Sequence, residues 1–301
     1  MFIDNYYYGH RKILKDFSDL NQSNLPGSIQ HGWIPSLPNK NTGKRKIKNI
    51  PFYCWNKKIH RISKMNGYKN NIIIGSPFIY YLIKNNISTK KEFGTLVFPA
   101  HSNLEDKIYN LYESQDFDIQ SLIKETEKKF NGPFTACLYY TQYTKKNIQA
   151  FEKNNWKTIC CGNKLNDNFL EILTSQIVKH EIIVCTEICT TVFYSLFLKK
   201  KTAIIKKNND LNINNVEHDY VQKCETNLKK KIPELFTSNC NSNIGYNIAC
   251  DELGFNYVKS KENLKQILKY NSFPHMIKCK IINLFFLLKY SFLLIRIKFN
   301  I

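Results

Sequence analysis

The chain has 301 residues and a formal net charge of +20, with 43% hydrophobic and 14% aromatic residues. This apolar content excludes an intrinsically disordered chain, because it is enough to offset the entropy cost of folding. The length predicts roughly two domains of about 150 residues each. The charge fits either a solvated lysine-rich surface or anionic partners such as nucleotide phosphates and acidic lipid headgroups. No arginine-rich or RNP-like motif is present, so we expect no nucleic acid as a partner.

The ten cysteines do not follow the spacing of a disulfide framework or of a zinc knuckle. Several lie inside apolar, strand-like runs, where free cysteine is common. The N-terminal stretch MFIDNYYYGHRK has no continuous apolar core, so we expect no secretory signal. These features favour a reducing, cytoplasmic location.

The first 131 residues predict an α/β domain with a parallel sheet, because helix-like and strand-like runs alternate along them. A helix is expected from His10 to Leu20, where apolar residues recur at helical spacing. Three strand-like runs each lead into a polar turn or helix. They begin at Ser28 with the turn His31-Gly32-Trp33, at Ile72 with the turn Gly75-Ser76-Pro77, and at Thr95 with the turn Pro99 to Asn103 and a helix over 104–112.

The sequence Asn131-Gly132-Pro133 is a strong turn signal and is the predicted domain boundary. Beyond it we expect a second α/β domain over residues 132–272. Its predicted strands are 134–140, 158–161, 182–185, 202–205 and a short one at 256–258, and its predicted helices are 147–154, 166–178, 192–198, 242–253 and 260–270.

The last segment, residues 273–301, differs in character. Its apolar run IINLFFLLKYSFLLI is interrupted by Lys289 and followed by Arg296 and Lys298. A spanning helix needs about 20 apolar residues, so the run favours a helix lying on an anionic membrane surface. A C-terminal helix packed on the domain core is the alternative.

Three segments resemble bacterial GT-B glycosyltransferases that build capsule and lipopolysaccharide, most of all the sialyltransferase-like and Kdo-transferase-like group. The segments are GTLVFPAHSN (Gly94 to Asn103), FTACLYYTQYT (Phe134 to Thr144) and HEIIVCTEICTTVFYSLFLKKKTAI (His180 to Ile204). The resemblance covers most of Ile29 to Ile204. It implies two Rossmann-like domains facing across a cleft, a CMP- or UDP-activated sugar donor, and a glycan or lipid-linked acceptor.

The resemblance also implies a site for the donor phosphate. In that group a histidine in a turn and paired hydroxyls at the start of a helix hold the phosphate, and the matching residues here are His101 with Ser102, and Thr190 with Thr191. A helix N-terminus binds anions through its unpaired N–H groups and its dipole, so no metal and no cofactor are expected. A threonine at this place equally fits a plain N-cap. Glu187, just upstream, fits a ribose contact or a solvated side chain.

The resembled group takes its catalytic base from an acidic Asp/Glu-Asp/Glu-Gly motif, and this sequence has no such motif. His31 is our substitute base, since it ends an early strand and Gly32 leaves room for a substrate. A histidine packed beside Trp33 is the alternative. His101 is also a candidate for assisting the leaving group.

Two further turns complete the candidate site. Gly75 and Ser76 are expected on the acceptor side, and Gly162 and Asn163 near the nucleotide base, although both pairs fit ordinary tight turns. The predicted function is a glycosyltransferase, peripheral on the inner face of a cytoplasmic membrane. The alternatives are transfer of a non-sugar group, such as pyruvyl or glycerol phosphate, and a non-catalytic basic membrane-binding protein.

Overall fold

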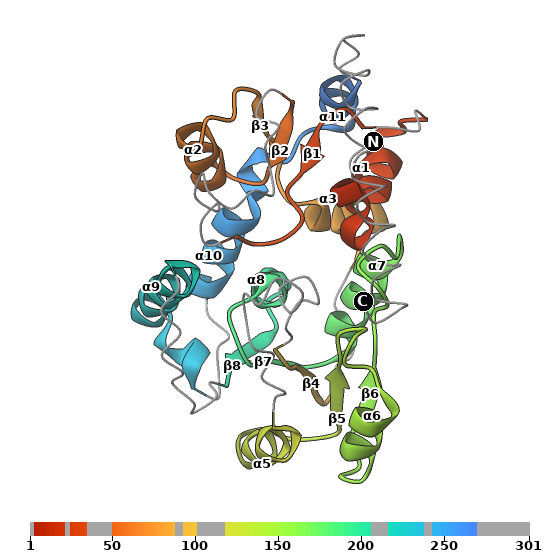
Figure 1. Cartoon of the computed structure of the whole chain (residues 1–301), viewed down its shortest axis with the longest axis vertical. Helices are drawn as coiled ribbons and strands as arrows, with labels where there is room; N and C mark the ends of the chain where they lie inside the picture. Colours follow the sequence, from red (N-terminus) through yellow and green to blue (C-terminus); the bar gives the residue numbers. More distant parts are fainter. Residues whose placement is uncertain are drawn as a thin grey trace, which may run out of the picture. The chain divides into compact units, whose positions relative to one another are not determined.

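The computed structural model describes residues 3–21, 25–34, 50–87, 93–100, 118–205, 216–237 and 243–269. The chain divides into two compact units (Figure 1). Unit 1 consists of Met1–Asn86, Lys164–Asn168 and Asp251–Ile301, and unit 2 consists of Ile87–Asn163 and Phe169–Cys250. Each unit is described by itself below.

Unit 2 contains a five-stranded, fully parallel sheet with the order β6-β5-β4-β7-β8. Its strands are β4 (Thr95–Phe98), β5 (Phe134–Cys137), β6 (Lys157–Ile159), β7 (Ile182–Cys185) and β8 (Lys201–Ile204). The chain runs outward from β4 to β6 and then returns to the other side of β4 with β7 and β8. This is the strand order of a doubly wound sheet, and its topological switch point lies between β4 and β7.

These strands are connected by α5 (Ile119–Lys129), α6 (Lys145–Glu152), α7 (Phe169–Lys179) and α8 (Thr190–Phe197). After β8 follow α9 (Val216–Lys231), the 3-10 helix η2 (Pro233–Phe236) and α10 (Asn243–Leu253). Local capping explains where two of them begin. The Asp118 carboxylate accepts hydrogen bonds from the first N–H groups of α5, and the Thr144 hydroxyl accepts one at the start of α6.

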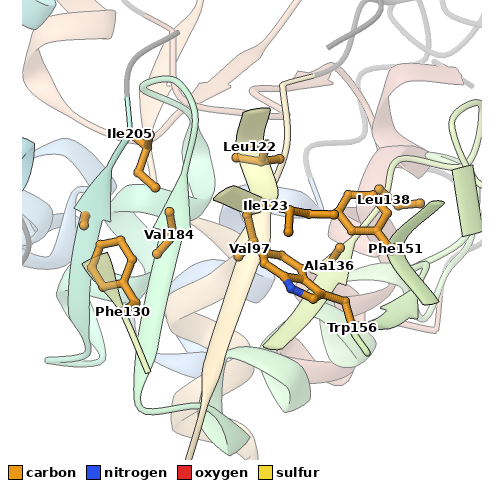
Figure 2. Packing of buried hydrophobic residues seen from close by; sticks show 11 residues of the cluster. Val97, Leu122, Ile123, Phe130, Ala136, Leu138, Phe151, Trp156, Val184 and Ile205 are labelled. Atoms are coloured by element: carbon orange, nitrogen blue, oxygen red, sulfur yellow. The ribbon is translucent and has the colours of Figure 1, made fainter. Parts of the chain in front are cut away.

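The core of unit 2 lies between the sheet and helices α5 and α6. The strand register places four small or β-branched side chains in one row across the sheet, namely Val97, Ala136, Val184 and Ala203. Figure 2 shows Val97, Ala136 and Val184 of this row together with Leu122 and Ile123 of α5 and with Phe151 of α6 beside Trp156. Small residues in the row leave room for the large ones, as close packing of the interior requires.

Unit 1 contains a smaller parallel sheet with the order β1-β2-β3. Its strands are β1 (Ser28–Ile29), β2 (Phe52–Cys54) and β3 (Asn71–Ile73), and its helices are α1 (His10–Ser18), α2 (Lys57–Met65), α3 (Pro77–Asn85) and α11 (Lys261–Leu268), with the 3-10 helices η1 (Ile3–Gly9) and η3 (Phe255–Tyr257). Phe52, Cys54 and Ile59 form a buried cluster against which Ile73 packs.

The end of α10 belongs to unit 1, where three contacts fix it. The Ser76 N–H donates to the Leu253 carbonyl at 2.8 Å, and the Asn56 amide donates to the Glu252 carbonyl at 2.7 Å. Gly254 follows with a φ of +70°, and a Cβ there would lie 1.8 Å from the Trp55 carbonyl oxygen. Only glycine therefore allows the chain to pass this point so closely.

The predicted α/β class with parallel sheets is confirmed, and the bounds of the strands at 95–98 and 182–185 agree with those of β4 and β7. The grouping of the strands differs from the expectation. β4 was assigned to the first domain, but it pairs with β5 and β7 at the centre of the unit 2 sheet, and residues 251–269 return to unit 1. The predicted boundaries at 131 and 272 therefore do not coincide with the edges of the two units.

Three local predictions need correction or fall outside the described residues. Residues 256–258 do not form a strand, because η3 follows directly from the left-handed Gly254. Strand β2 and helices α2 and α9 were not anticipated. The predicted helix over 104–112 and the segment 273–301 lie outside the described residues, and none of the described helices is long and apolar enough to cross a bilayer.

Candidate functional site

The carboxyl ends of β4 and β7 are joined at the switch point of the unit 2 sheet. The Thr186 N–H donates to the Phe98 carbonyl at 3.2 Å, and the Thr186 hydroxyl accepts from the Ala100 N–H at 2.6 Å. The residues that follow these two strands therefore lie side by side. In open α/β sheets this is the position where ligands bind.

Helix α8 begins at this switch point and brings Thr190 and Thr191 to it. Cys189 is the N-cap residue, with an extended backbone and no side-chain capping hydrogen bond, so the two threonines occupy the first helical turn and are half-buried. They are not the N-cap that the alternative interpretation required. Among the described residues the Thr191 hydroxyl has no hydrogen-bond partner. Two hydroxyls at the positive end of a helix form a place for an anion.

A pair of cysteines supports the start of α8, and sequence reasoning assigned it no role. The thiol of Cys185, the last residue of β7, forms a hydrogen bond with Cys189, and this bond lowers the pKa of Cys189. The N–H groups of Val192 and Thr191 act in the same direction. The same contact, together with burial, raises the pKa of Cys185. Cysteine is not among the preferred N-cap residues, so no motif pointed to this position.

Glu187 lies in the same loop, between β7 and α8. Its side chain is exposed by surface area, yet the surrounding protein raises its pKa to about 7 by disfavouring the charged form. A carboxyl group that is partly protonated at neutral pH repels a neighbouring phosphate less and can donate a hydrogen bond.

The other residues predicted for the donor lie elsewhere. Gly162 and Asn163 follow β6, the edge strand, and so stand two strands from β4, which is about 10 Å at the usual spacing. Gly162 has a φ of +88°, and its N–H donates to the Cys160 sulfur at 3.2 Å, as in a tight turn. His101 and Ser102 lie outside the described residues. In the ranges that the structure describes, no three His, Cys, Asp or Glu side chains form a potential metal site.

In unit 1, the turn that carries His31 is held by Gln30, which sequence reasoning did not single out. The buried Gln30 amide accepts from the Trp55 N–H at 3.0 Å and donates to the Gly32 carbonyl at 2.9 Å. The Trp55 indole donates to the Gln30 carbonyl at 3.0 Å. These bonds tie the turn after β1 to the end of β2, so the backbone of His31 is fixed at the carboxyl edge of the sheet.

The His31 ring packs against an aromatic and basic neighbourhood. Its centroid lies 5.3 Å from that of Tyr7 in a T-shaped arrangement, and the Lys164 ammonium lies 4.5 Å from the same tyrosine ring. Trp33 turns to another partner, because its indole N–H donates to Glu252 at 2.9 Å. His31 is half-exposed, so its ring combines a fixed backbone with access to solvent.

Gly75 and Ser76 are buried at the end of β3. The Ser76 hydroxyl accepts from the Phe78 N–H and caps α3, while Gly75 adopts a φ of +80° against Gly254 and Val258. These contacts account for both residues as parts of a tight turn. We therefore leave them out of the surface that we propose for an acceptor.

The structure thus brings Glu187, Thr190 and Thr191 together in unit 2, and His31, Gly32 and Trp33 in one turn of unit 1. No protein-family model matches the chain, and no curated protein matches it. Among solved structures the chain is similar to two variants of the wall teichoic acid polymerase TagF. One is 13% identical over 71% of this chain and 52% of that chain, the other 11% identical over 80% and 59%, and both have a TM-score of 0.34. The chain thus spans between half and three-fifths of these structures, and such similarity establishes neither fold nor activity.

Proposed function

We propose that the chain is a glycosyltransferase of the GT-B type, in which unit 2 binds a nucleotide-activated sugar and unit 1 binds the acceptor. The observation that carries the proposal is the switch point of the unit 2 sheet. There the ends of β4 and β7 are tied together, and α8 begins with Thr190 and Thr191 in its first turn. This arrangement supports an anion site at the place where doubly wound sheets bind nucleotides.

In the proposed reaction, an acceptor hydroxyl attacks the anomeric carbon of the donor sugar, and the bond from that carbon to the phosphate oxygen breaks. Thr190, Thr191 and the positive end of α8 stabilise the negative charge that develops on the departing phosphate. His101 and Ser102, which follow β4 in the sequence, would add phosphate contacts. These groups need no metal and no cofactor.

His31 is the proposed base, which takes the proton of the acceptor hydroxyl. The hydrogen bonds of Gln30 to Trp55 and Gly32 hold the His31 backbone, and the ring is half-exposed. An alanine variant at His31 should lose turnover but keep donor binding, because the residue belongs to the other unit. Full turnover by this variant would remove His31 from the mechanism.

The decisive test is calorimetric binding of CMP, UDP and GDP to the full chain, followed by assays of donor hydrolysis with the corresponding CMP-, UDP- and GDP-sugars. Replacing Thr190 and Thr191 together with valine should weaken nucleotide binding by about 1 to 3 kcal/mol, which is about 5- to 150-fold. The helix should stay intact, because neither threonine is its N-cap. Thr226→Val, at an exposed position of α9, is the matched control.

A folded chain that binds no nucleotide would overturn the proposal. If the double valine variant instead lost a comparable amount of thermal stability and bound nucleotide as before, the two hydroxyls would only support the helix. The mass of the product separates sugar transfer from transfer of pyruvyl or glycerol phosphate.

We further propose that the enzyme works at the inner face of the cytoplasmic membrane and passes the sugar to a surface glycan or its lipid-linked precursor. The support is the sequence of residues 273–301, which combines an apolar run with Lys289, Arg296 and Lys298. Each cationic residue near an anionic surface contributes about 1 kcal/mol. Deleting Phe273 to Ile301 should abolish sedimentation with phosphatidylglycerol vesicles and leave nucleotide binding unchanged. A non-catalytic membrane-binding protein would bind vesicles and no nucleotide.

A further inference from the structure

The loop after β5 places a group of tyrosines at the carboxyl edge of the unit 2 sheet. Leu138, labelled in Figure 2, is buried and directly follows β5, and Tyr139, Tyr140 and Tyr143 come after it. The rings of Tyr139 and Tyr140 lie 4.7 Å apart and are tilted by 59°, and Tyr143 is 41% exposed. Because β5 is next to β4, the loop stands one strand from the switch point.

The loop has a defined backbone. The Gln142 and Tyr143 N–H groups both donate to the Tyr139 carbonyl, at 2.8 and 3.1 Å. The Gln142 carbonyl accepts from the Asn147 amide at 2.8 Å, which ties the loop to α6. Three tyrosines on a loop held in this way lose little conformational freedom when a ligand stacks on them.

The side-chain amide of Gln142 has one satisfied and one unsatisfied end. Its Nε2 donates to the Ala100 carbonyl at 3.0 Å, and this bond fixes which end of the amide is the nitrogen, because a carbonyl oxygen accepts and never donates. The Oε1 atom is buried and has no hydrogen-bond partner. An unsatisfied buried acceptor is unfavourable, so the site favours a ligand that brings an N–H donor to it.

We propose that the loop 139–143 is the nucleobase site of the donor, with the tyrosine rings as the stacking surface and Gln142 Oε1 as the acceptor for an exocyclic amino group of the base. The inference rests on the proposed function and adds the residues that read the base. β5 and β7 are two strands apart, so the loop and the α8 phosphate site lie about 10 Å apart along one sheet edge. A nucleotide lying along the edge places its phosphate at one site and its base at the other.

The proposal distinguishes the two ends of the nucleotide, which gives a direct test with CMP, UMP and ribose 5-phosphate as calorimetric probes on the full chain. Tyr140→Ala and Tyr143→Ala should each weaken CMP binding about tenfold, since base stacking on an aromatic ring has this magnitude. Neither should change binding of ribose 5-phosphate, which has no base. The double valine variant at Thr190 and Thr191 should weaken both probes.

Phe93→Ala is the matched control, because Phe93 is a 66% exposed aromatic residue that precedes β4 at the opposite end of the sheet. It should bind all three probes as the unmodified chain does. The role of Gln142 is tested by the ratio of CMP to UMP affinity. CMP carries an amino group where UMP carries a carbonyl, so the unmodified chain should prefer CMP, and Gln142→Leu should remove the preference. If Gln142→Leu does not fold, the ratio of CMP to UMP affinity in the unmodified chain still tests the role of Gln142.

Unchanged CMP binding in both tyrosine variants would overturn the base site while leaving the proposed function in place. Equal weakening of CMP and ribose 5-phosphate would assign the tyrosines to loop structure and also overturn it. A chain that binds no nucleotide at all would overturn both proposals. Equal affinity for CMP and UMP in the unmodified chain would overturn the role of Gln142.

Discussion

His10 provides the sharpest test of how burial governs stability in unit 1. It is the first residue of α1 and only 1% exposed, with the Trp55 ring centroid at 6.1 Å and that of Tyr8 at 5.9 Å. Neither ring nitrogen makes a hydrogen bond of acceptable geometry. Burial lowers the pKa of His10 to about 3, because the charged imidazolium loses its hydration. The residue is therefore neutral in the folded chain at all ordinary pH values.

The sign of the effect follows from proton binding. Below pH 6.5 the unfolded chain binds a proton at His10, whereas the folded chain does not. The free energy of unfolding therefore falls as the pH falls from 6.5 toward 3. At pH 5 the difference is 1.5 pH units, and at about 1.4 kcal/mol per unit the unfolded state gains about 2 kcal/mol. His10→Leu removes the titrating group at similar volume. Between pH 7.5 and pH 5, the free energy of unfolding of this variant should not show the decrease of about 2 kcal/mol that His10 causes.

The assay is urea unfolding followed by tryptophan fluorescence in a Trp156→Phe background. The chain has three tryptophans, and the remaining two, Trp33 and Trp55, both lie in unit 1. His60→Leu is the control, because His60 is a partly exposed histidine of the same unit. It should keep most of the pH dependence of the parent. Parallel pH profiles for the parent and His10→Leu would refute the reasoning, since they would mean that the folded chain accommodates the proton.

Three further changes test separate parts of the structure. The first probe is a nucleotide phosphodiester, whose phosphate does not titrate near neutrality. Its affinity should weaken as the pH rises through about 7, because Glu187 then becomes negatively charged. Calorimetry should find no such trend in Glu187→Gln, and the same trend in the variant and the unmodified chain would contradict this. Gly254→Ala should destabilise unit 1 by about 2 kcal/mol or more in the fluorescence assay, because the φ of Gly254 is +70° and the new Cβ would meet the Trp55 carbonyl. An unchanged urea midpoint would contradict the close approach of Gly254 to Trp55. Lys200→Met should cost about 1 to 3 kcal/mol of thermal stability, because the buried ammonium donates to two carbonyls at the end of α7. Lys179→Met, at an exposed position, should have little effect. Equal effects of the two variants would argue against a stabilising role of the Lys200 hydrogen bonds.

The strands of unit 2 were predictable because strands buried on both faces read as continuous apolar runs. The runs at 95–98 and 182–185 match β4 and β7 residue for residue. The helix after β7 was expected two residues late, at Val192, because Cys189 is an unusual N-cap and gave no signal. Strand β2 and helix α2 were missed although Phe52 and Ile59 form part of the unit 1 core.

The candidate site was predictable only in part. Thr190 and Thr191 were placed at a helix start from the strand-turn-helix pattern and from the resemblance to GT-B glycosyltransferases. The roles of Gln30 and Gln142 were not, because a glutamine in a turn is an ordinary residue until its hydrogen-bond partners are known. Those partners directly follow other strands: Gln30 bonds to Trp55, after β2, and Gln142 bonds to Ala100, after β4.

The sequence by itself determined the α/β class, most strands, and the polar turns that end them, because these depend on periodicity and turn residues within a few positions. Only the tertiary structure decided which strands share a sheet. β4 follows the strands of unit 1 along the chain, yet it pairs with β5 and β7, and the segment after α10 returns to pack on Trp55 and Ser76. Parallel strands are joined by long connections, so their order depends on side-chain packing between distant segments, which local patterns do not encode.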